Sequence, residues 1–187
     1  GRPCSDVTEG RPMDIGKATW EACKAYDRLR ERFDAVVCEG SGSPAEINLR
    51  DRDIANIGMM RERSIPAVLV GDIERGGVFA ALYGTWKLVP EGQRGLLKGF
   101  MVNRFRGDPT ILGSGIARIE EITGMKCLGV LPYADLRFPE EDSLSDSRGK
   151  MSGKDANSAF LDNLDSLIGE AERSGFDFEA LNGIAEE

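Results

Sequence analysis

The chain has 187 residues, of which 41% are hydrophobic and 30% are charged, and its formal net charge at pH 7 is −8. This composition is typical of a globular protein with a core, and the negative balance argues against nucleic acid as a partner, because phosphate backbones select basic surfaces. The sequence contains no histidine, which excludes Ser-His-Asp catalysis, Cys-His catalysis and histidine-bound metals within the chain.

Hydropathy and cysteine usage indicate the compartment. No apolar run approaches the roughly 20 residues that span a membrane, and no signal peptide is visible, so we expect no membrane contact and a cytoplasmic location. None of the four cysteines is spaced as CxxC, so a zinc site is not expected. Cys38 and Cys127 lie in apolar, strand-like runs, and we interpret both as buried, reduced thiols.

Helices and strands alternate along the main part of the chain. Apolar residues spaced three and four apart predict a first helix, and short continuous apolar runs predict buried strands. The predicted order is helix 13–32, strand 33–38, helix 51–62, strand 66–71, helix 78–88, strand 97–102, helix 111–123 and strand 126–131. Buried strands that alternate with helices predict an α/β fold, with a mostly parallel sheet flanked by helices.

The last part of the chain differs in charge. Residues 151–187 hold nine acidic and two basic side chains, a net charge of −7, which leaves −1 for residues 1–150. We divide the chain into a main domain over 1–143, a polar linker over 144–156 and an acidic helical tail over 157–187. Apolar residues at helical spacing predict tail helices near 160–171 and 176–184. We expect them to pack on the domain edge; the alternative is a docking helix for a partner or a second copy.

Polar or glycine-rich residues follow every predicted strand. The carboxyl ends of parallel strands share one edge of a sheet, and ligands bind there. Glu39 follows the first strand and precedes Gly-Ser-Gly-Ser, which suits a carboxylate that holds Mg²⁺ beside phosphates. Asp72 has the same position after the second strand. A solvated strand end without a ligand is the alternative for Glu39.

Other features at this edge are open to two interpretations. Alternating Arg and Asp at 50–53 form either a salt-bridged helix start or a loop that binds carboxylates, because arginine pairs with oxyanions in a bidentate way. Arg75, followed by two glycines, either cradles an anion at a helix N-terminus or belongs to a plain turn. Asn103 either reads a base edge or caps a strand. The phosphate-binding GxxxxGK[ST] loop does not occur in the sequence.

The strand-end segments resemble those of a known enzyme family. The run EGSGSPAEINLRDRDIAN at 39–56 is similar to the signature of cobyric acid synthases, the glutamine-dependent ligases of cobalamin biosynthesis. The next blocks of that family are resembled in the same order at 71–80, 98–108, 128–133 and 139–143. The likeness covers residues 33–143, with a weaker continuation over 1–32.

The resemblance implies a fold like that of dethiobiotin synthetase, of the P-loop NTPase type, and a ligase that uses ATP and Mg²⁺. In this family ATP phosphorylates peripheral carboxylates of adenosylcobyrinic acid a,c-diamide, and ammonia then displaces phosphate from the acyl-phosphate. The ammonia comes from glutamine at a separate amidotransferase domain. The implied partners are therefore the corrinoid substrate, a P-loop segment and a glutaminase domain.

The resemblance also implies roles for single residues. Glu39 is implied as the Mg²⁺ ligand near the γ-phosphate, and Asn103 as a contact to adenine, with Pro132 and Tyr133 beside it. The other positions divide between the acyl-phosphate (Gly40, Ser41, Gly42, Ser43), the corrinoid loop (Asn48, Arg50, Asp51, Asp53) and the same cleft (Asp72, Arg75). The candidate catalytic residues are Glu39, Ser41, Ser43, Asp51 and Asp72.

The sequence departs from the family in several ways. It lacks the phosphate loop, it has no histidine for a Cys-His-Glu glutaminase, Ser41 replaces the usual alanine, and the likeness ends after Ser143. We therefore expect either a fragment of a larger enzyme, inactive alone, or a shortened, non-catalytic relative that acts as a binding or assembly module. A related ligase, cobyrinic acid a,c-diamide synthase or dethiobiotin synthetase, is a further alternative. An exposed sheet edge would favour a homo-oligomer.

Overall fold

The computed structural model of the chain describes residues 14–40, 42–134 and 156–186, with the side chains of 156–160 left aside. Within these residues the sheet has three parallel strands in the order β1-β2-β3. The strands are β1 Ala67–Asp72, β2 Leu97–Phe105 and β3 Lys126–Pro132. The predictions of parallel strands at 66–71, 97–102 and 126–131 are therefore confirmed to within a few residues at their ends.

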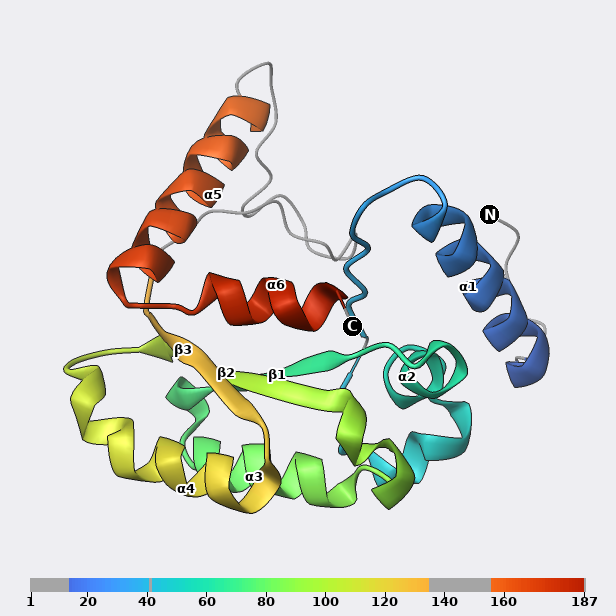
Figure 1. The fold of residues 1–187 in the computed structure, drawn as a ribbon, viewed down its shortest axis with the longest axis horizontal. Coiled ribbons are helices and arrows are strands. Elements are labelled where there is room, and N and C mark those ends of the chain that lie inside the picture. Colours follow the sequence, from blue (N-terminus) through green and yellow to red (C-terminus); the bar gives the residue numbers. More distant parts are fainter. Residues whose placement is uncertain (1–13, 41, 135–155, 187) are drawn as a thin grey trace, which may run out of the picture.

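The two faces of the sheet are covered by different helices. Helices α3 (Val78–Leu88) and α4 (Gly113–Thr123) lie on one face, and α6 (Phe178–Glu186) crosses the other (Figure 1). Each covering helix presents an apolar side to the sheet, so the chain forms layers of helix, sheet and helix. The predicted α/β class is confirmed.

The middle strand β2 alternates between the two apolar clusters. Phe100 and Val102 are 0% exposed and belong to the cluster under α3 and α4, whereas Met101 packs toward α6. Successive side chains of a strand point to opposite faces, so a strand that is covered on both faces requires a continuous apolar run. This requirement explains why residues 99–102 in the middle of β2 lack the polar alternation of a surface strand.

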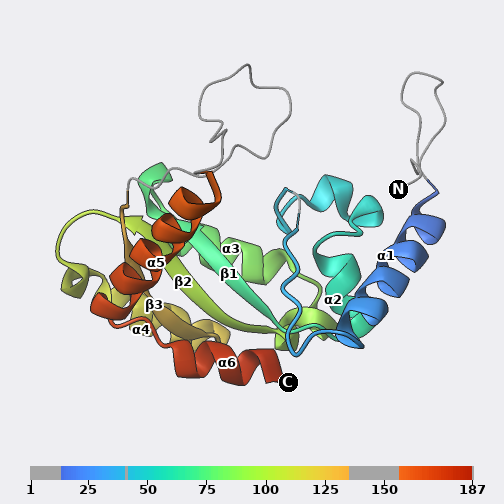
Figure 2. The same cartoon turned by 90° about the horizontal axis from the view of Figure 1, so that it is seen from above.

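Helices α1 (Ile15–Arg30) and α2 (Ile57–Arg63) lie together beside the sheet (Figure 2). Arg63 joins them, because its guanidinium donates to both carboxylate oxygens of Asp27 at 2.7 and 2.8 Å. This pair lowers the pKa of Asp27.

The helix predicted at 51–62 is divided in two. A 3-10 segment, η1 (Ile47–Arg52), is followed by α2, which begins only at Ile57. Asp53 lies at the break: its carboxylate accepts the backbone N–H groups of Ala55, Asn56 and Ile57, and so holds the two residues before α2 and its first residue.

Both tail helices form, and they contact the sheet. These are α5 (Ala156–Arg173) and α6. Phe176, between them, packs on β3 at Gly129, whose φ of +147° and close neighbours leave no room for a side chain: a Cβ there would lie 3.1 Å from Phe176 Cα. Asp177 starts α6, its backbone N–H donating to the Leu128 carbonyl and its carboxylate pairing with Lys126 Nζ at 2.6 Å.

Residues 33–38 do not form the predicted strand. Val37 is 94% exposed, and Cys38 is exposed as well. Residues 35–40 make no backbone hydrogen bond to the rest of the described chain, in which β1 pairs with β2 alone. A strand needs a hydrogen-bonded neighbour to bury its polar backbone, and this segment has none among the described residues. The predictions of a first strand and of a buried Cys38 are therefore wrong; Cys127 is half-buried in β3.

The predicted linker, except its last residue, lies outside the described residues, as does Ser41. Among the helices that the structure describes, we find none with the length and apolar character needed to cross a bilayer.

Candidate functional site

The carboxyl ends of the three strands meet at one edge of the sheet, which we call the rim (residues 72–77, 103–106 and 132–134). In the strand register Asp72 of β1 is paired with Asn103 of β2, and Phe105 of β2 with Pro132 of β3. The Tyr133 N–H donates to the Phe105 carbonyl oxygen over 2.8 Å. The predicted residues Asp72, Asn103, Pro132 and Tyr133 therefore share one edge of the sheet.

Arg104 ties the end of β2 to the end of β1. Its Nη2 lies 2.8 Å from Glu74 Oε2, and its Nη1 lies 3.5 Å from Asp72 Oδ2. Its backbone is left-handed, with φ +65°, at a point where the register between β2 and β3 shifts. The Arg104 N–H donates to Asn103 Oδ1 over 2.9 Å, which fixes the amide side chain at the rim.

Arg106 connects the same carboxylate to the end of β3. Its Nε and Nη2 lie 3.1 and 3.0 Å from Glu74 Oε1. Its guanidinium carbon lies 3.3 Å from the centre of the Tyr133 ring, which is a stacked cation–π contact. Glu74, and to a lesser degree Tyr133, raise the pKa of Arg106. One acidic side chain thus links all three strand ends.

Sequence reasoning missed Glu74, Arg104 and Arg106. A signal was available, because Arg104 and Arg106 are two apart at the end of a strand and so project on the same side. An acidic residue two positions beyond β1 lies on the neighbouring strand end, within reach of both. Pairing the strand ends by charge would have found this cluster.

Arg75 and the two glycines that follow form the turn into α3. Arg75 is 86% exposed in its side chain and lies 3.4 Å from Asp72 Oδ2. Gly76 and Gly77 have φ of +74° and +65°, a left-handed backbone that glycine adopts without steric cost. Of the two interpretations given for this segment, the structure contains the turn, and the Arg75 side chain extends from it into solvent.

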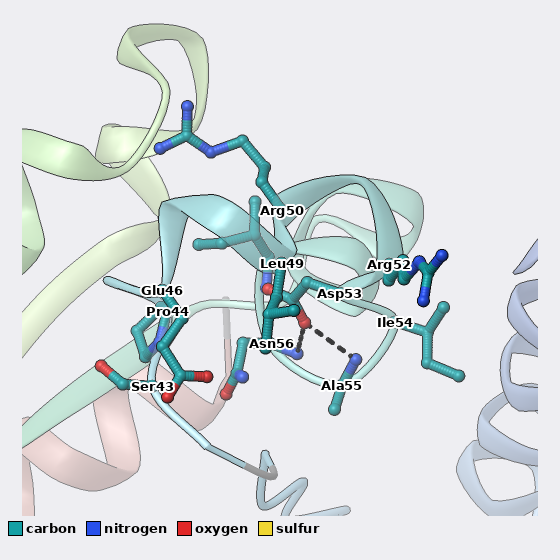
Figure 3. Close-up of a pocket in the computed structure, with 11 residues that line it drawn as sticks. Ser43, Pro44, Glu46, Leu49, Arg50, Arg52, Asp53, Ile54, Ala55 and Asn56 are labelled. Atoms are coloured by element: carbon teal, nitrogen blue, oxygen red, sulfur yellow. Dashed lines mark hydrogen bonds between the residues drawn. The ribbon is translucent and has the colours of Figure 1, made fainter.

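A second group of predicted residues surrounds a cavity of about 230 Å³ in the loop before α2 (Figure 3). Ser43, Asp53 and Asn56 are among the residues that line it. Asp53 accepts the N–H groups of Ala55 and Asn56 at 3.1 and 2.7 Å, so its carboxylate holds the backbone that leads into α2. The loop is therefore shaped by its own backbone contacts.

Close packing explains two glycines of this loop. A Cβ on Gly40 would overlap the Asn56 side chain, at 1.7 Å from Oδ1, and a Cβ on Gly42 would lie 2.8 Å from Glu46 Oε2. Glu39, next to Gly40, is exposed. The backbone after Glu39 thus runs against the Asn56 side chain, which would have to shift for any residue larger than glycine at position 40.

Arg50 of this loop contacts the end of α3 that is remote from the rim. Arg50 Nη2 donates to the carbonyl oxygen of Leu88, the last residue of α3, over 2.5 Å, whereas α3 begins next to the rim. An 11-residue helix is about 16 Å long. Asn48 and Asp51 are exposed in η1. The structure therefore brings Asp72, Arg75, Asn103, Pro132 and Tyr133 together at the rim. It places Ser43, Arg50 and Asp53 around the loop cavity, with Arg50 bonded at the other end of α3.

Several known proteins that are similar to this chain carry the name cobyric acid synthase. The probable cobyric acid synthase of Methanoculleus marisnigri is 56% identical over 156 residues, which cover 82% of this chain and 32% of that protein. That of Methanocella arvoryzae is 46% identical over 187 residues, or 99% of this chain and 37% of its own length. The cobyric acid synthase of Salmonella arizonae is 50% identical over 130 residues, which cover 70% of this chain and 26% of that protein.

The chain spans about a third of the length of the curated relatives it matches. The Methanocella match runs through the tail, so the prediction that the likeness ends after residue 143 is wrong. No protein-family model matches the chain, and no solved structure does. With relatives that match it from its first helix through its last, this chain belongs to the cobyric acid synthase family.

Proposed function

We propose that this chain is part of the ligase machinery of a cobyric acid synthase and acts in cobalamin biosynthesis. The observation that carries the proposal is the identity of 46% over 187 residues with a protein of that name, which covers both the rim and the loop before α2. The chain contributes binding sites for ATP and the corrinoid. Glutamine hydrolysis belongs to another segment, because a Cys-His-Glu glutaminase needs the histidine that these 187 residues lack.

The proposed reaction has two steps. A peripheral carboxylate of adenosylcobyrinic acid a,c-diamide attacks the γ-phosphorus of ATP, the bond to the β,γ-bridging oxygen breaks, and ADP leaves. Ammonia then attacks the acyl carbon, loses a proton, and expels phosphate, so that an amide remains. Such chemistry depends on positioning and on charge neutralisation more than on a protein nucleophile.

In this proposal the rim holds the nucleotide. Asn103, fixed by the Arg104 N–H, presents its amide to the adenine edge, with Pro132 and Tyr133 beside the base. Asp72 and Arg75 face the same cleft from the end of β1. The parallel α/β core supports this placement, because ligands of such sheets bind at the carboxyl ends of the strands. We propose a P-loop NTPase-type fold on the same ground.

Glu39 is the proposed Mg²⁺ ligand. Among the described residues, no group of three acidic, cysteine or histidine side chains could hold a metal by itself. Mg²⁺ commonly takes one or two carboxylates and completes its shell with phosphate oxygens and water, so a single exposed Glu39 fits an ion that the nucleotide also holds. The ion neutralises charge on the transferred phosphoryl group.

The loop before α2 supplies the substrate side. Gly40, Ser41, Gly42 and Ser43 border the acyl-phosphate, and Asn48, Arg50, Asp51 and Asp53 line the corrinoid loop. This assignment requires the loop to approach the rim when ligands bind. Arg50 then exchanges the Leu88 carbonyl for a corrinoid carboxylate, a partner that guanidinium pairs with more strongly.

Titration calorimetry of the chain with Mg-ATP tests the nucleotide part. We expect Glu39→Gln to weaken binding about tenfold, because it removes the charge that holds the ion. Glu121→Gln on α4 is the matched control, since it also removes one exposed carboxylate, the partner of Arg118, and neither residue belongs to the rim or to the loop before α2. Equal affinity of wild type and Glu39→Gln would remove Glu39 from the site. A wild type that does not bind Mg-ATP would mean that the chain is a fragment that cannot bind the nucleotide alone or a non-catalytic relative, and would remove the nucleotide site from these 187 residues.

A further inference from the structure

We propose that Glu74 is a positioning residue: it holds Arg104 and Arg106 and through them sets the shape of the nucleotide side of the rim. The inference rests on the proposed function, because it assigns the rim to ATP. It goes beyond that function in naming a residue that touches neither nucleotide nor substrate and acts through its two partners.

The first support is that the two carboxylate oxygens of Glu74 pair with different arginines. Oε2 pairs with Arg104, and Oε1 pairs with both Nε and Nη2 of Arg106. Both arginines come from the end of β2, while Glu74 comes from the end of β1. Its side chain is 30% exposed, against 47% and 61% for the arginines. Exposed ion pairs add little stability, so the ordering of two guanidiniums is the larger consequence of this arrangement.

The second support is the backbone of Arg104. A left-handed φ of +65° is uncommon for a residue with a side chain, and such strain persists where surrounding contacts determine the conformation. Here the contacts are the bonds from Arg104 to Glu74 and Asp72. The same turn places the Arg104 N–H on Asn103 Oδ1, so the bond to Glu74 helps to fix the amide proposed to read adenine.

The third support is the stack on Tyr133. The Arg106 guanidinium lies 3.3 Å from the ring centre and is oriented by two bonds to Glu74. Tyr133 is itself anchored by its N–H to Phe105. The three-part chain of Glu74, Arg106 and Tyr133 therefore forms a flat surface at the ends of β2 and β3, of the kind on which a purine base stacks.

Charge and position make opposite predictions for one substitution. The rim holds Asp72 and Glu74 against Arg75, Arg104 and Arg106, a net charge of +1. Glu74→Gln raises this to +2, which by charge alone would tighten the binding of an ATP anion. If Glu74 acts by position, the same substitution weakens binding, because Arg104 and Arg106 lose their common partner. The sign of the change separates the two roles.

The experiment is calorimetric titration of Mg-ATP into the 187-residue chain and its variants. We expect Glu74→Gln to raise the Kd about threefold to tenfold in spite of the added positive charge. Arg106→Lys, which keeps the charge and loses the planar fork, should have a similar effect. The double variant should lose no more than the larger single loss, since both changes break one contact. Glu121→Gln, which frees Arg118 on α4, should leave the Kd unchanged.

A spectroscopic signature accompanies the affinity. In nuclear magnetic resonance spectra of the wild type, the Tyr133 ring should shift the resonance of the Arg106 Nε–H, and this proton should exchange slowly with water. Glu74→Gln should abolish both the shift and the slow exchange, and Glu121→Gln should abolish neither. Unchanged or tighter ATP binding in Glu74→Gln would overturn the inference and leave the proposed function standing. A wild type that does not bind Mg-ATP would overturn both.

Discussion

The strand β2 and the segment 33–38 are both short apolar runs that lead into polar residues, yet they have opposite surroundings. β2 is hydrogen-bonded on both edges and covered on both faces, whereas Val37 in the other run is 94% exposed. The difference teaches that an apolar run becomes a strand through its neighbours. Strand propensity records how well side chains fit a paired, half-buried surface, and it does not act without that surface.

The largest expected difference between the two runs is in amide hydrogen exchange. Amides of residues 99–102 should exchange about a thousandfold more slowly than those of 35–38, after correction for intrinsic rates, because the former open only with the sheet. Exchange measured by mass spectrometry or nuclear magnetic resonance checks this. Comparable protection of both segments would show that 35–38 has a partner in solution and would end the comparison.

A pair of identical substitutions sharpens the comparison. Val102→Ala removes two methyl groups from a side chain that is 0% exposed and should lower the free energy of unfolding by about 2 kcal/mol. Val37→Ala makes the same change in solvent and should alter the free energy by less than about 0.5 kcal/mol. Urea unfolding of both variants provides the measurement. A loss at Val37 as large as that at Val102 would contradict the unpaired placement of the segment.

The smallest effect on stability should come from Asp177, which holds α6 against the sheet. Residues 33–38 have no such helix packed on them in the described part of the chain. Asp177 caps α6 by accepting the Ala180 N–H at 2.8 Å and pairs with Lys126. Asp177→Ala loses both contacts and should lower the midpoint of thermal unfolding by about 2–4 °C. Asp177→Asn keeps the cap and should lose less, so equal losses in the two variants would mean that the cap contributes nothing.

The same pair has a defined pH window. Lys126 lowers the pKa of Asp177 below its ordinary value of 3.8, and Asp177 raises that of Lys126 above 10.5. A lowered carboxyl pKa stabilises the fold above the unfolded-state value, and this contribution disappears as the pH falls through the folded-state value. The difference in stability between wild type and Asp177→Asn should therefore be present at pH 7 and disappear as the pH falls through the lowered pKa of Asp177. A difference that persists in acid would exclude the ion pair as its cause.

Much of the layered core could be predicted from the sequence. Residues 99–102 and 127–131 are apolar without polar alternation, a pattern typical of a strand that is covered on both faces. Helix 78–88 coincides with α3, because Gly77 permits the turn before it and Val89 leaves the helical conformation after it. The gathering of Asp72, Asn103 and Tyr133 at one edge followed from parallel strands alone.

What could not be predicted depends on contacts between distant segments. Glu74 pairs with Arg104 and Arg106, which lie 30 and 32 positions further along the chain, and the left-handed backbone of Arg104 has no mark in the sequence. Arg50 looked free to bind an anion, yet it donates to Leu88, 38 positions away. Local pattern specifies which residues are apolar, and tertiary contacts decide which polar groups remain available.

The exposure of Cys38 makes the segment before Glu39 directly observable. Among the cysteines that the structure describes, Cys23 is buried in α1 and Cys127 is half-buried in β3, while Cys38 faces solvent. Partial burial raises the pKa of Cys38, so alkylation is best carried out at mildly alkaline pH. In a Cys4→Ser background, a thiol-reactive label would attach first at this position. Its rate of attachment would then record, without any assay of catalysis, each ligand or protein segment that covers the approach to Glu39.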